Sequence, residues 1–270
     1  MDQKKPLRRE YVNGRYGQMH YRYAKPDAPT GKRPLLLFHM SPYSSFIYEA
    51  FAREMGRDRF TLAIDTPGFG ASDPPPSMPE VVDYAAAMGD VMDALGLRDV
   101  DVMGYHTGSK IALALTIQRP AQIHRVVNVS ATVFTPEELA EHKALYGPEE
   151  VADDGSHFVK WWNLAKRWRM KGVTNEALAE RFAVRMLNPS ISWWGHRAAF
   201  NFLSGDALPQ VQHPVLIFNP EDDLVDFTPR AKPLLKNPAS RIHDLPGWSH
   251  GFLDLKTAEV AKLVRDFLDV

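Results

Sequence analysis

The stretch Val102-Met103-Gly104-Tyr105-His106-Thr107-Gly108-Ser109 decides the fold of this chain. It continues an apolar-rich run at residues 99–104, which predicts a strand. It leads into residues 107–118, whose apolar positions have the spacing of a helix. Glycine at 104 and 108 lets a tight, strained turn fit between the two elements. We therefore expect a strand–turn–helix unit with His106 at its tip, above the carboxyl end of a sheet, where α/β folds bind ligands.

Strand and helix patterns alternate on both sides of this unit. Short apolar runs, typical of strands that are buried on both faces, lie at 34–39, 60–65, 126–129 and 214–218. Helical patterns lie at 44–56, 79–95, 228–236 and 256–268, and a further short strand is expected at 241–244. Residues 17–23 alternate in a way that indicates antiparallel edge strands within the first forty residues. This order predicts an α/β protein with a mostly parallel central sheet and helices on both faces.

The alternation stops after Ser130. Residues 131–208 contain helix-like stretches and no strand pattern, and they hold five of the six tryptophans. We predict a helical lid at 131–208, inserted into a core formed by residues 1–130 and 209–270. The lid tryptophans either pack the lid against the core or contact the ligand.

Composition excludes several classes of function. The formal net charge of −1 argues against nucleic acid or an anionic membrane as a partner, because both call for an excess of basic residues. With no cysteine, the chain has no disulfide, thiolate nucleophile or cysteine-ligated zinc. The charged N-terminus does not resemble a secretory signal, and no apolar run has the length of a membrane span. We expect a cytoplasmic protein that acts on a small molecule, and a homodimer is left open.

Four landmarks occur in the order found in one known family, each in the expected strand–loop setting. They are Phe38-His39-Met40-Ser41-Pro42, the spaced set Asp65, Gly68, Gly70 and Ser72, the turn Gly104-Tyr105-His106-Thr107-Gly108, and the late pair formed by residues 218–223 and 248–251. In these landmarks the chain resembles the α/β-hydrolase fold superfamily, whose nucleophile elbow is a strand–turn–helix unit. The resemblance covers nearly the whole chain apart from the lid.

The resemblance implies a set of catalytic roles. His250 occupies the position of the general base, and Asp223 that of the acid which orients it. Asp222 competes with Asp223 for this role, because a shift of one residue in the loop would exchange them. The backbone N–H groups of Ser41 and Thr107 would form the oxyanion hole, and the start of the helix at Thr107 favours negative charge there.

His106 departs from the family pattern, because serine is expected at the elbow tip. Imidazole carries no hydroxyl to deprotonate, so an acyl-serine mechanism is excluded there. His106 could activate a water, attack as a nucleophile, or bind a metal together with His250 and Asp223. The chain also resembles a subset of the superfamily with histidine at this place, although the sequence does not show whether His106 is natural or introduced.

Further residues are candidates for the substrate pocket, namely His39, Tyr105, His157 and Trp161. His39 has a structural role in the family, where it holds the oxyanion loop, and Ser44 is expected to cap the following helix. The predicted function is hydrolysis of a small, largely apolar substrate with an ester, lactone or ketone carbonyl. A lyase, a cofactor-free oxygenase and a non-catalytic binding protein are the alternatives.

No cofactor is expected. We also expect no metal, because Asp223 should lie behind His250, near its far nitrogen and away from the pocket. His106 should be neutral at pH 7, since a second imidazole and the helix dipole both oppose its charge.

Overall fold

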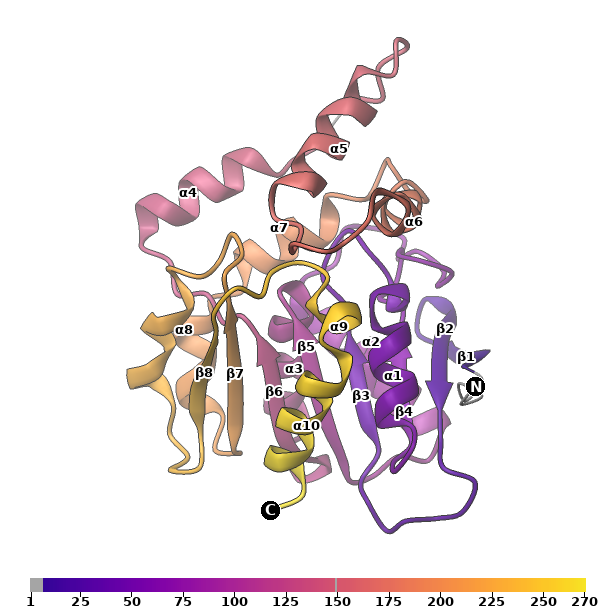
Figure 1. Cartoon of the computed structure of the whole chain (residues 1–270), viewed down its shortest axis with the longest axis vertical. Helices are drawn as coiled ribbons and strands as arrows, with labels where there is room; N and C mark the ends of the chain where they lie inside the picture. The colour runs from indigo at the N-terminus through magenta and orange to yellow at the C-terminus, as the bar shows by residue number, and fades with distance from the viewer. Residues whose placement is uncertain (1–6, 149) are drawn as a thin grey trace.

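An eight-stranded sheet lies at the centre of the computed structural model, which describes residues 7–148 and 150–270 (Figure 1). Residues 1–6, which begin the charged N-terminus interpreted above, lie outside the described residues. The strand order is β1-β2-β4-β3-β5-β6-β7-β8. The strands are β1 (Arg8–Gly14), β2 (Gly17–Ala24), β3 (Leu35–Phe38), β4 (Thr61–Ile64), β5 (Val100–Tyr105), β6 (Ile123–Val129), β7 (Val215–Pro220) and β8 (Arg241–Leu245).

The predicted sheet topology is confirmed. β1 and β2 form an antiparallel hairpin at one edge, and β2 joins β4 in antiparallel fashion. All neighbours from β4 to β8 pair in parallel, so their carboxyl ends meet at a single edge. The apolar run at Leu35–Phe38 is fully buried, as expected for a strand that is covered on both faces.

Helices cover both faces of the sheet (Figure 1). On one face α2 (Val81–Ala94) packs against α3 (Thr107–Gln118), and α8 (Ser204–Ala207) contacts α3. On the other face α1 (Glu49–Met55) contacts both α9 (Phe252–Leu255) and α10 (Thr257–Leu268). The expected helix at 228–236 is a 3₁₀ helix at Thr228–Leu234, which contains Pro233. Proline lacks the N–H that a continuing α-helix needs.

The segment between β6 and β7 contains helices and, among its described residues, no strand of the sheet. Four of these helices lie above the carboxyl edge of the strands (Figure 1). They are α4 (Pro136–Leu145), α5 (Ser156–Arg167), α6 (Asn175–Arg185) and α7 (Trp194–Asn201). Within the described ranges, no helix is long and apolar enough to cross a lipid bilayer.

Candidate active site

The turn at His106 has the strained geometry of an elbow. His106 adopts φ 48° and ψ −106°, a region that costs a non-glycine residue about 1–3 kcal/mol. Its N–H donates to the carbonyl of Val129 at 3.0 Å, which ties the turn to β6. A Cβ at Gly104 would lie 2.1 Å from the carbonyl oxygen of Gly108, and one at Gly108 would lie 1.9 Å from that of Phe38. Both positions therefore require glycine, as the sequence indicated.

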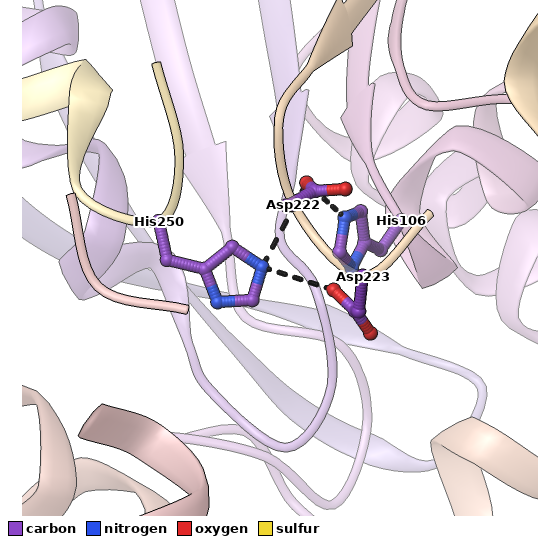
Figure 2. Close-up of side chains that lie close together, drawn as sticks. All are labelled: His106, Asp222, Asp223 and His250. Atoms are coloured by element: carbon purple, nitrogen blue, oxygen red, sulfur yellow. Dashed lines mark hydrogen bonds and ion pairs between the residues drawn. The ribbon is translucent and has the colours of Figure 1, made fainter. Parts of the chain in front are cut away.

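An acidic pair follows β7 and reaches this turn (Figure 2). Asp222 is completely buried, and its Oδ2 lies 2.9 Å from Nε2 of His106. Its other oxygen accepts the N–H of Leu224 at 2.9 Å, so the carboxylate is fixed at both ends. The elbow histidine is thus oriented by a buried acid, which is the relation that the family pattern assigns to His250.

His250 lies beside the same two carboxylates. Its Nε2 is 3.4 Å from Oδ1 of Asp223 and 3.7 Å from Oδ2 of Asp222. The ring centroids of His250 and His106 are 5.3 Å apart. Backbone hydrogen bonds connect the His250 loop to the lid: the N–H of His250 donates to Trp168, and the N–H of Met170 donates to His250. The lid therefore helps to place this histidine.

The expected position of the acid is wrong. Asp223 does not lie behind His250 at its far nitrogen, because both carboxylates approach the same Nε2 (Figure 2). The physical reason is the length of the side chain at the elbow. An imidazole at position 106 reaches Asp222 directly, which a serine hydroxyl is too short to do.

The carboxylates also change the proton affinity expected for His106. Burial favours the neutral ring, but the charge of Asp222 and its hydrogen bond outweigh burial and raise the pKa of His106 above its ordinary value. The expectation of a neutral His106 took into account only the second histidine and the helix dipole, which both oppose its charge. Because Asp222 was left out, the expected direction of the pKa shift is wrong. Burial acts against the charged form of Asp223 as well, yet its contact with His250 holds the pKa of this carboxyl well below its usual range.

The same four side chains could hold a metal ion. One ligand atom from each of His106, Asp222, Asp223 and His250 lies within 4.8 Å of the others. Two imidazoles with carboxylates suit first-row transition metals. Asp223 lines the cavity and is not turned away from the pocket, so the reason given above for a metal-free site is wrong.

Two backbone groups are available for an oxyanion. The N–H groups of Thr107, the first residue of α3, and of Ser41 donate to no other group among the described residues. Both residues line one cavity together with His106.

The cavity wall also contains residues that the sequence did not single out. Lys110, Ser130 and His196 line it together with aromatic side chains of Phe134 and Phe200. Burial, followed by the nearby charge of Arg185, lowers the pKa of His196 to about 3, so its ring is neutral. Lys110 lies four residues after His106 on the helix predicted at 107–118, and no signal in the sequence indicates that it faces a cavity.

Of the four proposed pocket residues, only Tyr105 reaches a cavity near the site. It lines a second cavity, together with His250. His39 is 1% exposed, and its ring nitrogens contact the carbonyl of Met40 at 3.0 Å and the N–H of Thr66 at 2.9 Å. It holds the loop, as in the family, and does not line either cavity.

His157 and Trp161 do not line these cavities either. Both are buried in α5, where their rings contact each other edge to face at 5.1 Å. Their assignment to the pocket is corrected to packing within the lid. Ser44 does cap the following helix, since its Oγ accepts the N–H of Phe46.

Comparison with known proteins identifies the fold. Residues 33–164 match the sequence model of the family described as alpha/beta hydrolase fold. Together with the strand order and the elbow, this match shows that the chain has the α/β-hydrolase fold.

Several named relatives are hydrolytic enzymes. Haloalkane dehalogenase 2 of Mycobacterium bovis is 33% identical over 141 residues, which are 52% of this chain and 47% of the dehalogenase. The chain thus spans about half the length of that relative. The 2-hydroxy-6-oxo-2,4-heptadienoate hydrolase of Pseudomonas putida is 25% identical over 227 residues, 80% of each chain. In structure the chain is similar to the enol-lactonase of Burkholderia xenovorans, with a TM-score of 0.79, 17% identity, and 97% and 100% of the two chains covered.

Proposed function

We propose that the protein is a hydrolase of small carbonyl substrates in which a water molecule, activated by His106, takes the place of the serine nucleophile. The observation that carries this proposal is the 2.9 Å contact between Nε2 of His106 and the buried carboxylate of Asp222. An acid that fixes one imidazole nitrogen leaves the other to act as a general base. Nδ1 of His106 makes no hydrogen bond within the described chain, and the residue lines the cavity.

The proposed reaction proceeds in two steps. Nδ1 of His106 removes a proton from water as the hydroxide oxygen bonds to the carbonyl carbon, and the carbonyl electrons move onto oxygen. The N–H groups of Thr107 and Ser41 stabilise this oxyanion at the N-terminus of α3. When the carbonyl re-forms, the bond to the leaving oxygen breaks, and that oxygen takes the proton from His106.

His250 and Asp223 act indirectly, through His106 and Asp222. Nε2 of His250 faces both carboxylates, at 3.4 Å from Oδ1 of Asp223 and 3.7 Å from Oδ2 of Asp222. In this proposal it is a positioning residue, which keeps Asp222 directed toward His106. This differs from the family pattern, in which it would be the base.

The substrate class is an ester or a lactone. The relatives support this class through their names, which include an enol-lactonase and the Bacillus subtilis carboxylesterase YbfK. The proposed chemistry requires no cofactor.

Substitution at the elbow tests the proposal. We expect hydrolysis of p-nitrophenyl acetate, and a loss of kcat of about 10²–10⁴-fold in His106→Gln, the usual contribution of a general base. Asp222→Asn should lower kcat by a comparable factor, because the amide oxygen stays with the N–H of Leu224 and the NH2 group, a donor, then faces Nε2. Asp223→Asn should have a smaller effect. His213→Gln, whose ring contacts the carbonyl of Pro120 away from the cavities, is the matched control.

The identity of the nucleophile is tested separately. After rapid quenching, intact-mass spectrometry should find no acyl adduct, and a fluorophosphonate probe should leave every serine unmodified. An acyl group on His106 would show that the imidazole is itself the nucleophile. Labelling of Ser41 or Ser44 would place the nucleophile in the oxyanion loop, and either result would overturn the proposal.

A further inference from the structure

The cavity beside His106 contains a buried lysine that the proposed reaction does not use. Lys110 lies one turn after the elbow on α3 and is only 7% exposed. Its ammonium donates to the carbonyl of Phe202 at 2.7 Å, and it forms no ion pair with any carboxylate of the described chain. Buried lysines are almost always paired, because an isolated ammonium loses its hydration without compensation.

A second polar group with unused capacity lies on the same wall. Ser130 is 2% exposed, and its Oγ has no hydrogen-bond partner among the described residues. Its φ of 64° is strained for a serine, and within residues 7–148 and 150–270 only His106 shares a positive φ among non-glycine residues. Both strained residues line the cavity that holds Lys110. Strain of this kind is retained at functional sites and ligand contacts.

These groups are complementary to one chemical class. An ammonium with free donors and a hydroxyl donor in a cavity with aromatic walls match a carboxylate attached to an apolar chain. Asp223 is the acid on the same wall, and its Oδ1 lies 3.4 Å from Nε2 of His250. Burial lowers the pKa of Lys110 to about 7, so a bound anion would draw the lysine toward its charged form.

We propose that Lys110 and Ser130 form a subsite for a substrate carboxylate, which makes the substrate a small monoanion with an ester or lactone group elsewhere in its chain. The inference rests on the proposed function and replaces a largely apolar substrate with an amphipathic one. Lys110 is then a specificity-determining residue one helical turn from the base.

A matched pair of esters tests the subsite through turnover. Mono-p-nitrophenyl glutarate carries a terminal carboxylate, and p-nitrophenyl valerate is its neutral counterpart of equal chain length. We expect kcat/KM to favour the glutarate, and Lys110→Met to lower the ratio of the two values at least tenfold. Lys171→Met, at an exposed lysine, should leave the ratio unchanged. Equal rates on both esters, or an unchanged ratio in Lys110→Met, would overturn the subsite.

Binding provides a readout that does not depend on hydrolysis. Titration calorimetry with glutarate should show binding to the protein, at least tenfold weaker binding to Lys110→Met, and an intermediate loss in Ser130→Ala. Pentanamide should not bind measurably. If glutarate binds in this pattern while no ester is hydrolysed, the proposed function fails and the subsite stands. If Lys110→Met binds glutarate as well as the parent protein does, the carboxylate subsite is wrong. It is also wrong if borohydride reduction traps a ketone as a Schiff base on Lys110.

Discussion

His106 shows how one side chain redirects the contacts of a catalytic centre. The acid loop, the late histidine and the helix N-terminus are all in the positions that the superfamily pattern implies. Only the pairing differs, because Nε2 of His106 lies 2.9 Å from the buried carboxylate of Asp222. Asp223, which is partly exposed, remains for His250. In the proposed function, the base thereby moves from the late loop to the elbow.

Reversing this exchange should restore the pattern of the family. In His106→Ser the short hydroxyl no longer reaches Asp222, which leaves both acids to His250. We expect this variant to react with a fluorophosphonate probe at the introduced serine and to show weak aryl-esterase activity through an acyl-enzyme. Peptide mass spectrometry locates the label. A folded variant without any label would show that His250 does not turn toward the elbow tip.

Activity should not depend on a metal ion. Nε2 of His106 and Oδ2 of Asp222 are at hydrogen-bond distance, which is shorter than the spacing of about 3.3 Å between ligands of a tetrahedral ion with bonds near 2.0–2.1 Å. We expect protein treated with a chelator to retain its esterase rate, and elemental analysis to find less than one ion per chain. Stoichiometric zinc, iron or manganese that is lost together with activity would contradict this prediction.

At the scale of elements, the contact between β3 and α3 fixes the elbow. α3 begins so close to the sheet that a Cβ on Gly108 would collide with the backbone of Phe38, and no side chain fits between them. The helix can then direct its first N–H groups at the cavity while its residues from Thr107 to Thr116 are buried.

Gly108→Ala should accordingly destabilise the whole protein. The added methyl would overlap a backbone oxygen, which cannot move without displacing β3, and we expect a loss of about 2–4 kcal/mol in the free energy of unfolding. Gly147→Ala is the matched control, because nothing lies within 4 Å of a Cβ there. Urea denaturation measures both. Equal stability of the two variants would show that α3 can move away from the sheet.

At the scale of the molecule, patterns among residues close together in the sequence were enough to predict the fold. Buried strands, helix spacing and the two elbow glycines depend on neighbours in the chain, and they led to the correct elements apart from the helix expected at 228–236, which is a 3₁₀ helix. The pairing of Asp222 with His106 depends on side-chain length across 116 positions, so no local pattern encodes it. Lys110 was missed for a related reason. All residues from Thr107 to Thr116 are buried, and the sequence does not indicate which of them face a cavity.

The pH dependence of stability should reflect a group distant from the site. Asp101 in β5 is 1% exposed, and burial raises its pKa from 3.8 to about 7 against the opposing charges of Arg59 and Arg33. Because the folded state holds this proton more tightly, its stabilising effect is complete below about pH 4 and is lost as the pH rises to about 7.

Asp101→Asn removes this dependence. Relative to the parent protein it should gain up to about 4 kcal/mol in unfolding free energy at pH 8, and little at pH 4. Urea denaturation at both values measures the gain. A variant that is less stable than the parent at pH 8 would show that the charged carboxylate is well accommodated.

The distribution of tryptophan gives the molecule an optical asymmetry. Trp161, Trp162, Trp168, Trp193 and Trp194 lie between β6 and β7, and Trp248 precedes the loop of His250. The sheet and the helices on its faces have none, so nearly all intrinsic tryptophan emission originates above the carboxyl edge of the strands. Tryptophan fluorescence will thus report on the lid and the loop of His250, whereas far-ultraviolet circular dichroism reports on the whole backbone. If the two signals change at different temperatures on heating, the lid opens separately from the unfolding of the core.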